Sequence, residues 1–145
     1  MKIRNLKAED LVSCALIYVR AFSTHPHYEK WDEKVALRRL TEFYERDPAN
    51  CYCAEIGNKI VAVLFADTHT WRDGVNVQVL EVAVDPDYQG KGLGRGLLST
   101  CADIFRGKNY RRMEILVNRF GLVAQLYQQM GFQETDYYIM VKELQ

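Results

Sequence analysis

The chain has 145 residues, of which 48% are hydrophobic and 26% charged, a composition typical of soluble globular proteins. Its 19 basic residues balance 19 acidic ones, which argues against a protein that grips nucleic acid through overall charge. The longest purely apolar run, Ile60 to Ala66, is too short to cross a bilayer, and the N-terminus lacks the apolar core of a signal peptide. We therefore expect a single cytoplasmic domain over residues 1–145, with no nucleic-acid or membrane partner.

The N-terminal third is predicted to form one short strand and two helices. "KIRNL" indicates the strand, and apolar residues recur at helical spacing from Ala8 to Phe22. Pro26 interrupts this pattern. Asp32 is placed to cap a second helix, which Asp47-Pro48 ends.

The middle of the chain has the period of strands. "CYCAEI" and "KIVAVLFADTH" are predicted strands joined by a tight turn at Gly57-Asn58. "TWRDGVN" is expected to be a loop, and "VQVLEVAV" a further strand that ends at Asp85-Pro86. A glycine-rich stretch then opens a helix that runs to about Arg106.

The C-terminal part is predicted to hold a strand at "MEILVN", a helix from about Phe120 to Met130 and a last strand at "FQETDYYIMVKEL". Gly131 is placed to end the helix in the left-handed conformation. The order β-α-α-β-β-β-α-β-α-β predicts an α/β (α+β) fold, with a mixed, mostly antiparallel sheet and helices on both faces.

The four cysteines form no CxxC pair, and Cys51 and Cys53 share one face of a predicted strand. The three histidines supply no evident ligand set, so no metal is expected. Buried or half-buried thiols in a reducing compartment are favoured over a metal site or a disulfide. The remaining cysteines are Cys14 and Cys101.

The stretch "DPDYQGKGLGRGLL" joins a predicted strand to a predicted helix and has the features of an anion-binding turn. Glycines let backbone N–H groups converge, and the helix adds its positive dipole end. The P-loop pattern fails, since Asp85 stands where its first glycine belongs and Gly92 where Ser or Thr belongs. The dinucleotide pattern GxGxxG also fails, at Arg95 and Leu97. The pattern [QR]-x-x-G-x-[GA] is matched in full from Gln89 to Gly94.

This match resembles the acetyl-CoA-binding motif of the GNAT superfamily of N-acetyltransferases. "IRNLKAED", "VLEVAVDPDYQGKGLGRGLL" and "ILVNRFGLVAQLYQQMGF" resemble successive segments of that family, so the likeness covers essentially the whole chain. "RAF" with "PHYEKWDEKVALRRL" is similar to aminoglycoside N-acetyltransferase-like members. The resemblance implies transfer of an acetyl group from acetyl-CoA to a primary amine of a small molecule or peptide, in a ternary complex.

The resemblance also implies roles for individual residues. A bulge near Glu81 would separate its strand from the next one and admit the thioester. Glu81 is the candidate general base, with a water relay as the alternative and Asp67 and Asp136 as weaker candidates. Tyr127 is the candidate acid for the leaving thiolate. The residues expected to bind acetyl-CoA are Val82, Ala83, Val84, Gln89, Gly90, Lys91, Gly92, Leu93, Gly94, Arg95, Asn118 and Tyr127.

Two of these residues could also have a purely structural role. Tyr127 lies on an apolar helical stripe and would also suit core packing. Asn118 ends a predicted strand and would also suit a helix N-cap.

Aromatic and acidic residues gather in the segments where the family binds its acceptor, which suits a cationic amine. The candidates are Tyr28, Trp31, Asp67, Trp71 and Asp136. The resemblance further implies a homodimer, formed through the C-terminal strand "DYYIMVKEL". Two other functions remain open. The first is a non-catalytic acyl-CoA sensor, which would need the glycine turn but not Tyr127 or a carboxylate. The second is a nucleotide-binding module, which both failed phosphate motifs disfavour.

Overall fold

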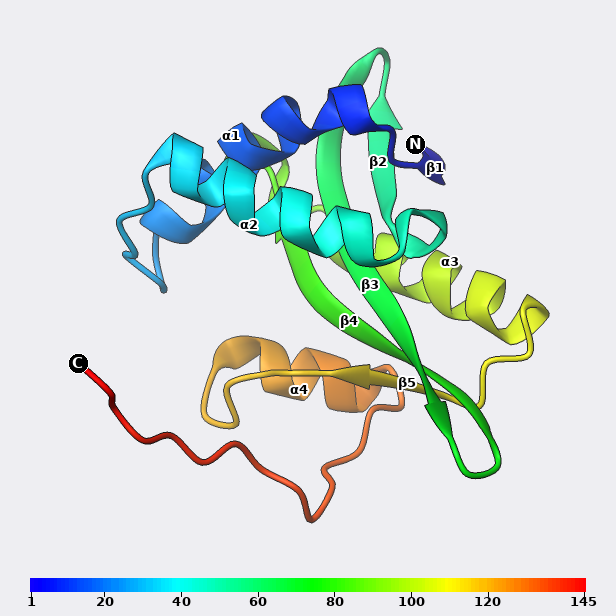
Figure 1. Cartoon of the computed structure of the whole chain (residues 1–145). Helices are drawn as coiled ribbons and strands as arrows, with labels where there is room; N and C mark the ends of the chain where they lie inside the picture. Colours follow the sequence, from blue (N-terminus) through cyan, green and yellow to red (C-terminus); the bar gives the residue numbers. More distant parts are fainter.

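The computed structural model describes all residues from 1 to 145 and contains one five-stranded sheet. The strands lie in chain order: antiparallel pairing joins the first four, and β5 pairs parallel with β4. The predicted mixed, mostly antiparallel sheet is therefore confirmed (Figure 1). The strands are β1 (Lys2–Asn5), β2 (Tyr52–Ile56), β3 (Lys59–Trp71), β4 (Gly74–Val84) and β5 (Arg112–Ile115).

Four α-helices and three short 3-10 helices connect the strands. The α-helices are α1 (Leu11–Ser23), α2 (Glu33–Arg46), α3 (Leu93–Gly107) and α4 (Leu122–Gln129). The 3-10 helices are η1 (Ala8–Asp10), η2 (Pro48–Asn50) and η3 (Pro86–Tyr88). Asp32 caps α2 as predicted, because its carboxylate accepts the backbone N–H groups of Lys34 and Val35. None of the helices combines the length and the apolar composition that crossing a membrane requires.

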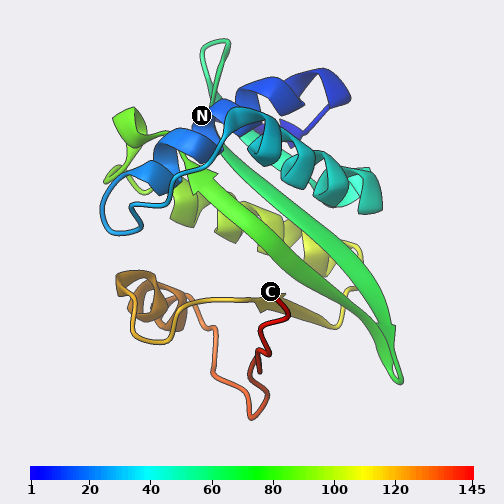
Figure 2. The ribbon, with the colours of Figure 1, turned by 60° about the vertical axis from the view of Figure 1, so that its left-hand side comes forward.

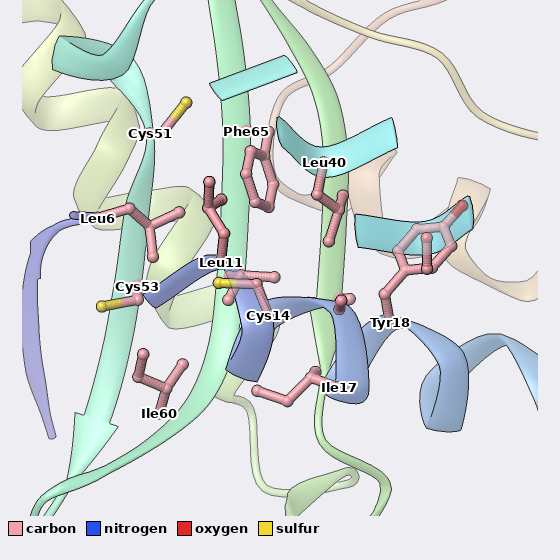
Figure 3. Packing of buried hydrophobic residues seen from close by; sticks show 14 of the residues in the cluster. Leu6, Leu11, Cys14, Ile17, Tyr18, Leu40, Cys51, Cys53, Ile60 and Phe65 are labelled. Atoms are coloured by element: carbon pink, nitrogen blue, oxygen red, sulfur yellow. The ribbon is translucent and has the colours of Figure 1, made fainter. Parts of the chain in front are cut away.

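Helices cover both faces of the sheet, as predicted: α1 and α2 lie on one face and α3 on the other (Figure 2). The core under α1 and α2 includes Leu11, Tyr18, Leu40 and Phe65 (Figure 3). The core under α3 includes Val77, Val79, Leu97 and Phe105. The central part of the sheet is thus buried on both sides, which determines the face on which each side chain of that part lies.

The four cysteines are buried free thiols, as the sequence indicated. Cys14, Cys51 and Cys53 lie in the core under α1 and α2, and Cys101 lies under α3. Burial raises the pKa of Cys51 and Cys53 to about 11 and that of Cys101 to about 12. These thiols therefore stay protonated and serve as small apolar core residues.

The prediction of a loop over the whole of "TWRDGVN" is wrong. β3 continues to Trp71 and β4 begins at Gly74, so only Arg72 and Asp73 form the turn. Trp71 pairs with Gly74 across this turn. Gly74 has a φ of +155°, which glycine adopts without a steric penalty. Trp71 therefore lies at the far tip of a long hairpin formed by β3 and β4.

The prediction of a last strand at "FQETDYYIMVKEL" is also wrong, because residues 133–145 form no strand. The segment runs alone beyond α4 and finds no ladder partner (Figure 1). A strand needs a neighbouring edge for its backbone groups, and alternation of apolar residues does not provide one. The apolar side chains of this segment are consequently exposed; they are Tyr137, Tyr138, Ile139, Met140, Val141 and Leu144.

Candidate active site

A bulge in β4 directs Glu81 towards α1 and α2. Phe65 of β3 pairs with Glu81 and the next residue, Ala66, pairs with Val79, so β4 contains one extra residue, Leu80. Val79 belongs to the core under α3, whereas Leu80 packs against the core under α1 and α2. Regular alternation would place Glu81 on the face of Val79, and the extra residue moves it to the opposite face. The expected bulge near Glu81 is confirmed.

Glu81 is a largely buried carboxylate with a side chain only 13% exposed. Arg39 of α2 places its Nη2 at 3.3 Å from Glu81 Oε2. Burial raises the pKa of Glu81, while Arg39 and the facing Tyr18 hydroxyl of α1 oppose that rise. Because the net shift is upward, Glu81 is a stronger base than an exposed glutamate.

Tyr127 lies within electrostatic range of Glu81 and also packs in the core. Burial raises the pKa of its hydroxyl, and the charge of Glu81 adds to that rise. The ring lies 5.7 Å from the ring of Phe132 and packs against the core under α3. The packing role and the position near Glu81 are therefore compatible in one side chain.

β4 and β5 diverge beside Glu81 and leave one edge of β4 free. β5 pairs with β4 only as far as Val79, and beyond Ile115 the chain turns away (Figures 1 and 2). The Asp85 N–H donates to the Val61 carbonyl of β3. Because backbone groups alternate along a strand, Val82 and Val84 present N–H and C=O groups to the free edge, whereas those of Ala83 face β3.

The glycine-rich turn follows this free edge and presents backbone donors. Gly90 and Gly92 have φ values of +78° and +76°, a region that favours glycine. A Cβ on Gly94 would lie 3.2 Å from Val84 Cγ2, a tight contact, so glycine lets the start of α3 lie close to β4. No protein acceptor receives the backbone N–H groups of residues 90–95. These donors, at the positive end of the α3 dipole, form a cradle that fits an anion such as pyrophosphate.

Side chains hold this turn in place. The buried Asp85 carboxylate accepts from Arg20 Nη1 of α1 and from the Asp87 N–H, each at 3.0 Å. Gln89 Nε2 donates to the Val84 carbonyl at 3.1 Å and thereby ties the turn to the free edge of β4. Lys91 extends over the Tyr88 ring, 5.3 Å from its centroid. The turn is thus braced by its own chain and carries positive charge.

Asn118 lies in the loop that separates β5 from α4. Its Oδ1 accepts the Phe120 N–H at 3.0 Å, and its carbonyl accepts the Gly121 N–H. Gly121, not Asn118, is the N-cap residue of α4. The asparagine therefore shapes the turn after the diverging strand.

The acceptor candidates are spread over the molecule. Trp31 lies near Glu81, since its ring packs edge-on against Tyr18 at 5.0 Å. Asp67, on β3, is paired with Arg46 at 3.6 Å. Trp71 lies at the hairpin tip, about 20 Å along β3 from the residue opposite Glu81. Tyr28 and Asp136 are exposed, in the loop before α2 and in the C-terminal segment respectively. Of these five, Trp31 and Asp67 lie on the face of the sheet that Glu81 occupies, since Asp67 is two residues along β3 from Phe65, which pairs with Glu81.

Sequence reasoning missed Tyr18 and Arg39. Tyr18 falls on the apolar stripe of α1, where it is indistinguishable from a core residue. Arg39 precedes Leu40 on α2 and resembles a solvent-exposed helix residue. The bulge that moves Glu81 towards α2 gives Arg39 its partner, and no local pattern in α2 signals it. No group of three or more His, Cys, Asp or Glu side chains is arranged to hold a metal ion.

The sequence model of the acetyltransferase (GNAT) family matches residues 12–132. The [ribosomal protein bS18]-alanine N-acetyltransferase of Escherichia coli K12 is 33% identical over 134 residues, which cover 91% of this chain and 80% of that protein. The N-acetyltransferase MJ1207 of Methanocaldococcus jannaschii, itself uncharacterised, is 24% identical over 92% of this chain. The chain spans 61% of that archaeal relative and 37–39% of the mycothiol acetyltransferases that it also matches.

Solved structures show the same fold. A possible acetyltransferase from Clostridium difficile 630 superposes with a TM-score of 0.83 at 20% identity, covering 99% of this chain and 97% of the other. The aminoglycoside acetyltransferase AAC(6')-Iy, solved with a bisubstrate analogue, superposes with a TM-score of 0.71 at 18% identity, covering 98% and 97%. At these identities the likeness concerns the fold.

Proposed function

Because the chain belongs to the GNAT acetyltransferase family, whose members are acetyl-CoA-dependent N-acetyltransferases, we propose that it acetylates a primary amine of a small molecule or peptide. One observation carries the proposal. The anion cradle of residues 90–95, the free edge of β4 and the buried Glu81 carboxylate lie at one end of the same strand. We propose that residues 1–145 form one acetyltransferase domain.

The proposed cofactor site uses backbone groups more than side chains. The N–H groups of residues 90–95 would hold the pyrophosphate, with Lys91 and Arg95 adding positive charge. The free edge of β4 would pair with the amide-containing arm, as an added strand does. An N–H of Val82 or Val84 would then donate to the thioester oxygen as negative charge develops. Asn118 would contact the same arm from the loop after β5.

The proposed chemistry moves protons at the nitrogen and at the leaving sulfur. The amine nitrogen must be neutral to attack, and an alkyl amine has a pKa of ~10.4, so Glu81 accepts the ammonium proton and later releases it to solvent. The new C–N bond forms as the C–S bond breaks, and the nitrogen loses its second proton to water as the amide forms. Tyr127, whose raised pKa keeps its hydroxyl protonated, donates a proton to the departing thiolate and recovers one from water. One proton is released overall for each ammonium group that is acetylated.

An acetylation screen tests this function. The purified chain is incubated with acetyl-CoA and, separately, with a peptide bearing an N-terminal alanine, an aminoglycoside and a polyamine. Thiol release and the mass of the acetylated product are both measured. We expect amine-dependent release with at least one class. Calorimetric binding of acetyl-CoA without turnover of any amine would favour the non-catalytic sensor, and no binding at millimolar acetyl-CoA would contradict both functions.

Replacing Tyr127 with phenylalanine should lower kcat by about 100-fold, because the hydroxyl that protonates the thiolate is lost. The affinity for acetyl-CoA should fall much less, since phenylalanine retains the ring that packs on Phe132. Steady-state kinetics and calorimetry measure the two quantities. Equal kcat in the two proteins would remove Tyr127 from the mechanism.

We also propose that the chain forms a homodimer in a reducing, cytoplasmic compartment. The exposed apolar run Tyr137–Val141 supports the dimer, because such a run is costly in water and lies in an unpaired segment. The four free thiols support the compartment. Sedimentation equilibrium of the purified chain tests the dimer, and a mass of 16.9 kDa would contradict it.

A further inference from the structure

Arg39 lies beside the proposed base and is held by aromatic rings. Its guanidinium carbon is 5.7 Å from the centroid of Trp31 and 4.7 Å from that of Phe43. A planar guanidinium stacks well on such rings, and lysine does not reproduce this arrangement. The two rings therefore hold the guanidinium beside Glu81.

The contact between Arg39 and Glu81 is one-sided. Nη2 is 3.3 Å from Glu81 Oε2, while the buried Nε of Arg39 has no hydrogen-bond partner. Arg39 therefore engages the carboxylate through a single N–H group at Oε2. The Tyr18 hydroxyl is the second donor that faces the carboxylate.

We propose that Arg39 is a positioning residue for acetyl transfer: clamped by Trp31 and Phe43, it keeps Glu81 charged and orients its carboxylate. The inference rests on the proposed function and deepens it, because it extends the catalytic arrangement into α2. Arg39 takes no part in the bond changes, in which the amine proton passes to the Glu81 carboxylate.

Among the charged and titratable groups around Glu81, Arg39 is the one that stabilises its ionised form through an ion pair. Tyr18 faces the carboxylate from α1, Glu29 from the loop before α2, and Tyr127 from α4. Glu29, whose carboxylate accepts from Trp31 Nε1 at 2.8 Å, opposes ionisation of Glu81. Arg39 is the cation that contacts Glu81, whereas Arg46 of α2 is paired with Asp67 of β3. Removal of Arg39 would therefore leave a buried carboxylate without a counter-charge.

Arg39→Gln should move the acid limb of the pH profile of kcat/KM to higher pH by about one unit. The sign follows from the loss of a positive charge, which raises the pKa of the carboxyl that must be ionised. Arg39→Lys should restore the position of the acid limb but not the full kcat, because the stacked plane is missing. Acetyl-CoA affinity should be unchanged in both variants.

Arg46→Gln is the matched control. Arg46 lies on the same helix and over the same Phe43 ring, at 5.2 Å, but pairs with Asp67. Its loss should leave the acid limb in place. If Arg39→Gln does not fold, Phe43→Leu removes half of the clamp and should shift the limb in the same direction by a smaller amount.

A readout without turnover separates this proposal from the proposed function. The Glu81 carboxyl is titrated by carbon-13 NMR in the intact chain, with its resonance assigned by its loss in Glu81→Gln. The titration should move upward in Arg39→Gln and not in Arg46→Gln. An unmoved Glu81 titration would overturn the role of Arg39, even in an active enzyme. Failure of the amine screen with a moved titration would contradict the proposed function alone.

Discussion

Gly92→Asp is expected to weaken acetyl-CoA binding by about 100-fold or more. Gly92 is the N-cap residue of α3, with a φ of +76°, and its N–H belongs to the proposed pyrophosphate cradle. A carboxylate at this position would face the negative charge of the ligand. Juxtaposed like charges cost several kcal/mol, and each 1.4 kcal/mol is a factor of ten in affinity.

Calorimetric titration with acetyl-CoA measures this loss, and Gly92→Asn is its control. Asparagine has the shape of aspartate and a similar tolerance of the left-handed region, but it carries no charge, and a Cβ at this position would meet no atom within 4 Å. The two variants should therefore unfold at similar temperatures and differ in affinity. An aspartate variant that binds as the unmodified chain does would place the cofactor elsewhere.

Glu81→Gln is expected to lower kcat/KM by about 100-fold near neutral pH, a typical contribution for a general base. The carboxamide fits the same buried site but accepts no proton from the amine. The variant then depends on amine that is already neutral in solution, and this fraction rises with pH towards the amine pKa of ~10.4. The loss should therefore be largest at low pH and shrink as the pH rises.

The pH dependence of kcat/KM for both proteins measures this effect, with acetyl-CoA affinity as the control for an intact cofactor site. Parallel profiles would contradict the role of Glu81 as base and favour a water relay. Because burial raises the pKa of Glu81, the acid limb of the unmodified enzyme should lie above the range of an exposed glutamate.

Local patterns predicted most of the elements and their order. The helix cap at Asp32, the hairpin turn at Gly57 and the left-handed Gly131 depend on a few neighbouring residues, and all three are present. The matched motif from Gln89 to Gly94 located the anion cradle for the same reason. Positive φ and unpaired N–H groups at a helix start follow from glycine positions alone.

Features that depend on distant partners were predicted less well. The C-terminal segment has the alternation of a strand, yet a strand forms only where another edge is available. The reach of the β3–β4 hairpin, which carries Trp71 away from Glu81, depends on pairing along both strands. Asp136 and Trp71 were grouped with the acceptor site because their residue types suit an amine, and residue type carries no information on distance.

The sequence by itself determined the class of fold, the position of the glycine-rich turn and the identity of Glu81 and Tyr127 as candidates, because each depends on local spacing. The tertiary structure alone decided what surrounds Glu81. One extra residue in β4 moves its side chain to the α1–α2 face, where Tyr18 and the clamped Arg39 meet it. Burial and counter-charge are properties of the packed molecule, so the basicity of Glu81 arises only when α1, α2 and β4 come together.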